Sequence, residues 1–308
     1  MTARFRMVAG PNGSGKTTLM RRLAADYAVN FYESINADDI FAEVSRSGRY
    51  APRMSMPDGI LRSYAAATSY PEDVRRFFAD GRVALDGDRV RFTPDAVNSY
   101  TVALLADFLQ EMYIAGGASF SRETVFSHPS KVAALAAARK AGFKTYLYFV
   151  ATESAEVNVA RVANRVALGG HSVPREKIES RFADSVANAA VALPHLSRAF
   201  FFDNSGETMR FFAEWGEDSG LTRPAGAEGC EPAWFAPVAE AAARLPGAGG
   251  APSADGPAIA AAAEVAGREA AEQALAAGLP VTLVRDGRVV TILPDGAAGK
   301  RERKGAFR

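Results

Sequence analysis

The sequence has 308 residues with an apolar share of 48%, which favours one large domain with an appendage. A formal net charge of +1 gives no bulk attraction to nucleic acid or membrane, and a single cysteine, Cys230, excludes a disulfide framework and a thiolate metal cluster. No apolar run is long enough to span a bilayer, so we expect a soluble protein. The cysteine content favours a reducing, cytoplasmic location, and the balanced charge predicts no nucleic-acid or membrane partner.

The first predicted elements are a short strand at residues 5–9, a glycine-rich loop, and a helix that starts at Lys16. The loop matches the phosphate-loop pattern G-x-x-x-x-G-K-[ST] at every fixed position. Glycines let backbone N–H groups turn toward a phosphate, and the helix start adds partial positive charge. We therefore predict ATP binding, with Lys16 on the β- and γ-phosphates and the Thr17 hydroxyl on Mg²⁺, although an ordinary glycine-rich turn is the alternative. The predicted nucleotide-binding residues are Gly10, Asn12, Gly13, Ser14, Gly15, Lys16, Thr17 and Thr18.

A second strand is predicted at residues 30–35, followed by the polar cluster Asn36-Ala37-Asp38-Asp39. Polar residues at the carboxyl end of a strand face the ligand crevice in an α/β sheet. Aspartate also favours the N-cap position of a helix. Asp38 and Asp39 therefore have two interpretations, a catalytic carboxylate and a cap of the helix that follows.

Residues 47–93 interrupt the alternation of strands and helices and are predicted to form an insertion. Gly and Pro residues separate short helical pieces in it, and the segments 82–85 and 89–92 flank Asp86-Gly87-Asp88 as in a β-hairpin. The stretch is too long for a plain connection, so we expect a lid or a substrate-covering element. Thr93-Pro94 is then predicted to open a long helix that runs to about residue 115.

Strands and helices alternate through the rest of the first two thirds of the chain. Strands are predicted at 118–123, 144–150 and 198–203, and helices at 131–141, at 153–168 and from Pro174 onward. The strand at 144–150 is almost wholly apolar, as in a buried parallel strand. This alternation predicts the α/β class, with a doubly covered parallel sheet.

The composition changes to Ala, Gly and Pro beyond Leu221, which sets the predicted domain boundaries. Residues 1–220 are expected to form the main domain and 221–257 a linker with a short helix near Trp234. Residues 258–296 form a small module of one helix and one hairpin, and 297–308 form a basic, solvated tail. Because such a module is marginal alone, we expect it to dock on the main domain.

With these pieces in place, the chain resembles the zeta-toxin family of P-loop kinases. The matching pieces, in chain order, are the loop Gly10 to Leu19, Ile35-Asn36-Ala37-Asp38-Asp39, Phe120-Ser121-Arg122-Glu123-Thr124, the stretch from Arg161 to Pro174 with its Gly-Gly-His, and Phe202-Asp203-Asn204-Ser205-Gly206. The resemblance implies a five-stranded parallel sheet, ATP and Mg²⁺, and phosphoryl transfer to a sugar hydroxyl, with UDP-N-acetylglucosamine as the acceptor in the best-known members. It also implies an antitoxin protein as a candidate partner. The insertion and the closing helix-hairpin depart from the family pattern.

The resemblance also assigns roles to residues beyond the loop. Asp38 matches the catalytic aspartate and is our candidate proton acceptor. Glu123, with Thr124 beside it, matches the substrate-binding glutamate, although a contact to the waters around Mg²⁺ is the alternative. Arg161 and Arg165 share one helix face, which is either a solvated basic face or a lid, with Arg165 as the catalytic arginine and Arg161 toward the substrate. His171 follows a glycine pair and either contacts the substrate or caps its loop.

Two other functions compete with a small-molecule kinase. A nucleotide-gated binding switch, which would bind ATP without phosphorylating a metabolite, is the second candidate. An ABC-type motor ranks third, because that class needs a Leu-Ser-Gly-Gly-Gln-like segment and an apolar strand that ends in Asp-Glu. Neither occurs, and the stretch from Ala167 to His171 is the nearest match.

Overall fold

The computed structural model describes residues 2–299 except 28, 58, 170–171, 226, 228, 230, 247–252 and 296–297. His171 and Cys230, as well as parts of the predicted linker and most of the predicted basic tail, therefore lie outside the described residues. The contacts within the chain divide it into two compact units. Unit 1 comprises Met1–Phe5 and Phe31–Thr124, and unit 2 comprises Arg6–Asn30 and Val125–Arg308.

The largest sheet has seven strands in the order β10-β9-β8-β7-β1-β6-β2. It contains the five strands predicted for the main parallel sheet, which are β1 (Arg4–Ala9), β2 (Glu33–Asn36), β6 (Phe120–Thr124), β7 (Lys144–Ala151) and β8 (Arg198–Asp203). The pairs β2–β6 and β7–β8 are parallel, as expected. The sheet is mostly parallel with helices around it, which confirms the α/β class. The number of five strands was too small, because β9 (Arg210–Gly216) and β10 (Gly220–Thr222) extend the sheet in antiparallel fashion.

The strand β9 was not predicted, because it returns antiparallel to β8 directly after it and so departs from the alternation of strands and helices. Every residue after Arg210 is buried, so apolar side chains occupy consecutive positions on both faces. Its one acidic residue, Glu214, is also buried, but it accepts hydrogen bonds from Arg198 and from the backbone and hydroxyl of Ser253. The carboxylate is thus compensated within the fold, which makes its burial tolerable.

Unit 1 contains the strands β2 and β6 and the predicted insertion at residues 47–93. After β2 its elements are α2 (Ala37–Ser47), β3 (Arg49–Tyr50), α3 (Ile60–Ala67), α4 (Glu72–Ala79), β4 (Val83–Asp86), β5 (Arg89–Phe92), the short helix η1 (Pro94–Ala96), α5 (Ser99–Ala115) and β6. A second, three-stranded sheet has the order β3-β5-β4, and β4 and β5 form the predicted hairpin. Stacked rings of Phe5, Phe120 and Tyr113 contribute to the core of this unit.

The long helix of unit 1 begins later than the sequence predicted. Pro94 opens only the single turn η1, and α5 starts at Ser99. Asn98 is its N-cap: the side chain accepts hydrogen bonds from the backbones of Tyr100 and Thr101, and Thr101 completes a capping box. This cap competes with proline as a helix-start signal and fixes the boundary.

Unit 2 contains the phosphate loop and most of the helices. Its elements after β1 are α1 (Lys16–Asp26), α6 (Ser130–Lys140), β7, α7 (Ala155–Ala167), α8 (Arg175–Ala192), η2 (Leu193–His195), β8, β9, β10, η3 (Ala233–Phe235), α9 (Ala236–Ala243), α10 (Gly256–Ala276), β11 (Val281–Arg285), β12 (Arg288–Ile292) and β13 (Ala298–Gly299). Aromatic rings interlock in its core, where Trp234 and Phe235 contact Phe149, Phe201 and Phe212.

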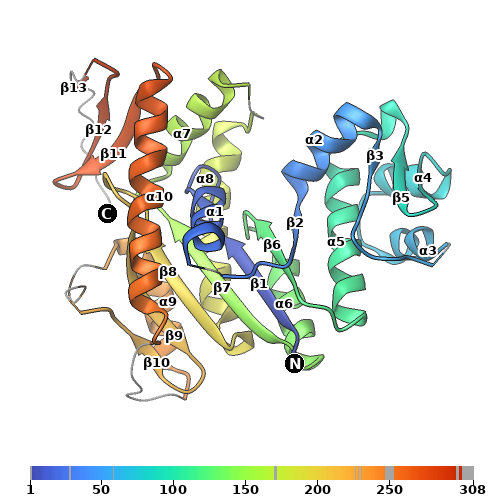
Figure 1. The fold of residues 1–308 in the computed structure, drawn as a ribbon, viewed down its shortest axis with the longest axis horizontal. Coiled ribbons are helices and arrows are strands. Elements are labelled where there is room, and N and C mark those ends of the chain that lie inside the picture. Colours follow the sequence, from blue (N-terminus) through green and yellow to red (C-terminus); the bar gives the residue numbers. More distant parts are fainter. Residues whose placement is uncertain are drawn as a thin grey trace. The chain divides into compact units, whose positions relative to one another are not determined.

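The C-terminal helix and hairpin pack on the rest of unit 2. Figure 1 shows α10 alongside α1, and the strands β11 and β12 next to α10. Helix α10 also contacts β9, and β11 contacts α7. The buried face of α10 consists largely of small residues, which allow close approach, namely Gly256, Ile259, Ala262, Ala263, Ala266 and Gly267.

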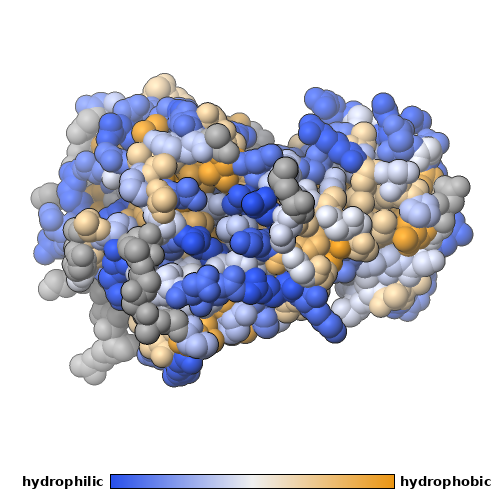
Figure 2. All heavy atoms as spheres, turned by 60° about the horizontal axis from the view of Figure 1, so that its bottom comes forward, coloured by the Kyte–Doolittle hydropathy of each residue, from blue (hydrophilic) through white to orange (hydrophobic). Residues whose placement is uncertain are grey.

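The surface view in Figure 2 shows hydrophilic residues around smaller apolar areas. Among the described residues, no helix combines the length and the apolar character that crossing a membrane requires.

Candidate functional site

The phosphate loop adopts a shape that requires glycine, most strictly at two of its positions. Gly10 has φ 143°, and a Cβ atom there would lie 1.9 Å from the carbonyl oxygen of Val150. Gly15 has φ 100°, and a Cβ there would lie 2.5 Å from the side-chain nitrogen of Asn204. Both backbone angles lie in the region that side chains disfavour. The glycines of the motif are therefore required by close packing as well as by the turn.

Polar side chains of the loop are buried where a phosphate would bind. Lys16 is the first residue of α1 and is 8% exposed, and its Nζ donates to the carbonyl of Pro11 at 2.9 Å. Ser14 is fully buried, and within the described part of the chain neither its hydroxyl nor the Asn12 side-chain oxygen has a hydrogen-bond partner. A buried polar atom without a partner is costly, so the cradle fits a polar ligand.

Two threonines follow the lysine at the start of α1. Thr17 and Thr18 are the second and third residues of the helix, and both are half-buried. The N-terminus of a helix carries partial positive charge and directs N–H groups outward. Ligands of this site would therefore be anionic, as the sequence motif predicts.

Two asparagines that the sequence analysis did not assign hold the loop in place. Asn158 of α7 donates its side-chain N–H to the carbonyl of Asn12, and Asn204, directly after β8, donates to the carbonyl of Ser14 at 2.8 Å. Both asparagines are buried. A sequence signal existed for Asn204, which follows a strand end, but the helical position of Asn158 gave none.

The predicted arginines lie on the helix that contacts the loop. Helix α7 carries Arg161 and Arg165, and its Asn158 carbonyl lies only 2.8 Å from where a Cβ of Gly13 would be. Burial lowers the pKa of Arg161 to about 10, and the negative charge of Asp203 opposes that shift. Burial also raises the pKa of Asp203, although hydrogen bonds with Ser205 oppose this shift. Desolvated charges of this kind occur often at functional sites.

Unit 1 brings the predicted acceptor-side residues to adjacent strand ends. Asn36 pairs with Glu123 across β2 and β6, and the Asn36 side chain donates to the Glu123 carboxylate at 3.2 Å. The same side chain accepts from the backbone of Asp38 at 2.9 Å, so Asn36 is the N-cap of α2. Asp38 is an exposed residue of the first helical turn, and Thr124 ends β6. The interpretation of Asp38 as the N-cap was wrong, because Asn36 holds that position.

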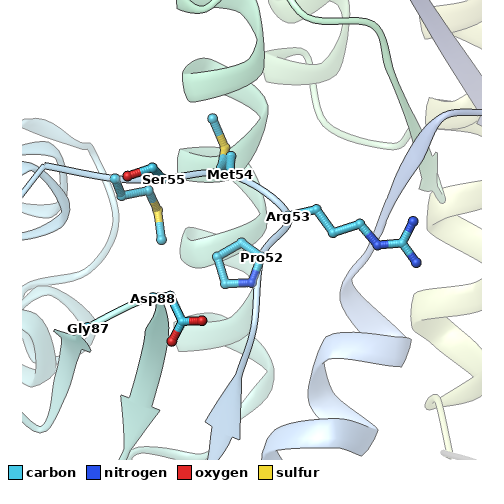
Figure 3. A pocket seen from close by; sticks show the side chains of 7 residues that line it. Pro52, Arg53, Met54, Ser55, Gly87 and Asp88 are labelled. Carbon is cyan, nitrogen blue, oxygen red and sulfur yellow. The ribbon is translucent and has the colours of Figure 1, made fainter.

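The inserted residues of unit 1 form a pocket of about 380 Å³. Figure 3 shows it between the turn of the β4–β5 hairpin, at Asp88, and the segment from Pro52 to Met56. The Arg53 side chain points away from Asp88 and forms an ion pair with Glu33 at 3.2 Å. None of the predicted site residues lines this pocket, so the role of the insertion as a cover remains a prediction.

The family comparison identifies the nucleotide-binding fold. The AAA domain family AAA_33 matches residues 6–185, which is more than half of the chain. The chain belongs to this family. The matched region includes the phosphate loop, the strand ends of unit 1 and helix α7. A P-loop domain of this kind is consistent with the resemblance to zeta-toxin kinases.

Similar solved structures are distant. A protein of Chloroflexus aurantiacus j-10-fl is 17% identical, with 59% of this chain and 77% of that chain covered and a TM-score of 0.34. A structure of the PezAT toxin-antitoxin system of Streptococcus pneumoniae is 13% identical, with 66% of this chain and 68% of that chain covered and a TM-score of 0.39. The AvrRxo1-ORF1:-ORF2 structure with ATP is 15% identical, with 87% of this chain and 81% of that chain covered and a TM-score of 0.43. Likeness at this level carries no functional argument, and no curated protein matches the chain.

Proposed function

We propose that the protein is an ATP-dependent kinase that transfers the γ-phosphate to a hydroxyl of a nucleotide sugar or a similar metabolite. The family match and the buried cradle support nucleotide binding. One observation favours phosphoryl transfer. Asn36 is the N-cap of helix α2, so Asp38 is not needed as a cap and its carboxylate at this strand end is open to another role. A carboxylate at the carboxyl end of a strand suits a proton acceptor.

The donor side of the reaction belongs to unit 2. The loop N–H groups and Lys16 would bind the phosphates of ATP, and the Ser14 hydroxyl would gain the partner that it lacks within the described residues. Thr17 would hold Mg²⁺ together with phosphate oxygens, and the bound ion supplies neutralisation of phosphate charge. Arg161 and Arg165 of α7 would stabilise the charge of the transferred group.

The acceptor side is assigned to unit 1. Glu123 and Thr124 at the end of β6 would bind the acceptor, and His171 is a further candidate for that role. Asp38 would take the proton of the acceptor hydroxyl. The oxygen of that hydroxyl would form a bond to the γ-phosphorus while the bond between the γ-phosphorus and ADP breaks. Little covalent work falls on the protein, so positioning and charge are its main contributions.

The direct test is to mix the purified protein with ATP, Mg²⁺ and a panel of nucleotide sugars that includes UDP-N-acetylglucosamine. We expect mass spectrometry to find one panel member with an added phosphoryl group. The Asp38→Asn variant should bind ATP but yield no comparable product. If the unmodified protein binds ATP and phosphorylates nothing in a broad metabolite panel, the nucleotide-gated switch replaces the kinase.

The resemblance to zeta toxins extends the proposal to an antitoxin partner. If the kinase acts as a toxin, its expression should stop growth of the host, whereas the Asp38→Asn variant should permit growth at the same protein level. Normal growth with the unmodified protein would contradict a toxin role and leave the phosphorylation test unaffected.

A further inference from the structure

The phosphate loop is held from two sides by the amides described above. Asn158 fixes the carbonyl of Asn12 and Asn204 fixes the carbonyl of Ser14. Carbonyls engaged in this way cannot turn into the cradle, so the pair helps to keep the loop in its phosphate-binding shape. The two amides come from different elements, α7 and the connection that follows β8.

Each of these elements is in turn tied to the C-terminal segment. The backbone N–H of Val284 in β11 donates to the carbonyl of Ser205 at 2.7 Å, one residue after Asn204. On the other side, the Asn164 side chain of α7 donates to the carbonyl of Pro280, directly before β11. The strand β11 therefore links the two supports of the loop.

Helix α10 supports the same region by direct packing. A Cβ at Gly267 would lie 2.1 Å from the backbone nitrogen of Met209, so the helix and the β8–β9 connection are in close contact. The methyl group of Met209 in turn lies 3.1 Å from where a Cβ of Gly15 would be. Arg22 of α1 and Glu269 of α10 also form an ion pair. Helices α1 and α7 and the β8–β9 connection thus join the C-terminal segment to the loop.

We propose that α10 and β11, here called the C-terminal brace, position the phosphate loop for its ligand. Asn158, Asn204 and Gly267 are positioning residues in this arrangement. The proposal rests on the proposed function only in taking a nucleotide as the ligand, and it does not depend on the acceptor. Loosening the brace should make the empty loop more mobile and lower nucleotide affinity, because part of the binding free energy would then be spent on ordering the loop.

The test compares substitutions at the two ends of the brace with a control on the same helix. Gly267→Ala inserts a methyl group against Met209, and Asn164→Ala removes the bond to Pro280. Arg268→Ala is the matched control, because Arg268 is exposed and forms an ion pair with Glu264 of the same helix. Equilibrium titration with a fluorescent ATP analogue gives the Kd, and hydrogen exchange reports on residues 10–15 without ligand.

We expect both brace variants to raise the Kd at least about fivefold and to speed hydrogen exchange in the loop, with no change for Arg268→Ala. Unchanged Kd and exchange in folded brace variants would overturn the proposal. If Gly267→Ala does not fold, as judged by circular dichroism, Asn164→Ala decides alone. If the unmodified protein binds no nucleotide, the proposed function fails, and faster loop exchange in the variants still decides whether the brace exists.

Discussion

The phosphate loop of unit 2 and the strand ends of unit 1 are held in different ways. The loop is buried or half-buried, its three glycines have no room for a Cβ, and two asparagines fix its carbonyls. At the strand ends, Asp38 is exposed and Glu123 is half-buried, and Asn36 connects them. The contrast indicates that packing constrains the phosphate loop, whereas the strand ends of unit 1, where we propose that the acceptor binds, are more exposed to solvent.

The largest effect is expected for Lys16→Ala. Removing the buried ammonium leaves the phosphate oxygens without their main counter-charge, so turnover should fall by about 10²–10³-fold or more. Steady-state kinetics of product formation measures this, and Lys177→Ala, an exposed lysine of α8, is the control. A Lys16 variant that folds and keeps most of its activity would refute the assignment of the loop.

Asp38→Asn should separate the two regions. The amide keeps the shape of the side chain but cannot take a proton, so transfer should fall at least about a hundredfold while ATP still binds. Asp39→Asn changes the neighbouring exposed carboxylate and should retain activity. Calorimetric titration with ATP provides the second readout. If ATP binding is lost instead, Asp38 belongs to the nucleotide or metal site.

Glu123→Gln should act on the acceptor. Loss of a charged hydrogen-bonding partner should raise the KM for the acceptor by about tenfold and leave the KM for ATP near its original value. Initial-rate kinetics with each substrate varied in turn distinguishes the two. A change that appears mainly in the Mg²⁺ dependence would favour the alternative, in which Glu123 contacts the waters around the ion.

The smallest effect is expected for Asn36→Ala. The substitution removes the N-cap of α2, so the free energy of unfolding should fall by about 1 kcal/mol, as measured by urea denaturation. Asn98→Ala removes the cap of α5 and should cost a similar amount. Only Asn36→Ala also removes the partner of Glu123, so only this variant should weaken phosphoryl transfer beyond its effect on stability. Equal transfer rates in the two variants would show that Asn36 serves only as a cap.

Much of the fold could be predicted because the local signals agreed with one another. The glycine motif, the apolar strand at residues 144–150 and the two hairpins each have a short-range cause, and the structure contains all of them. The start of α5 was misplaced because Pro94 and Asn98 are competing helix-start signals only four residues apart, and the cap at Asn98 prevailed. Strand β9 was missed because it follows β8 directly and pairs antiparallel with it, where the pattern of the chain predicts a helix between strands.

The candidate site was predictable where the chemistry lies in one short motif. The residues that hold the loop could not be predicted, because Asn158 and Asn204 donate to loop carbonyls that lie 146 and 190 positions away in the sequence. An asparagine in the middle of a helix carries no local sign of such a contact. The cap at Asn36 was hidden for a related reason, since Asp38 and Asp39 next to it are equally good candidates by residue type.

The packing of α10 on α1 also has a consequence for protein synthesis. Chains are made from the N-terminus at about 5–20 residues per second, so α1 leaves the ribosome on the order of tens of seconds before α10. During that interval the glycine loop lacks the partner helix that covers its own helix in the finished protein. A nascent chain that has not yet reached residue 276 should therefore bind ATP less tightly than a chain in which α10 has formed and packs on α1.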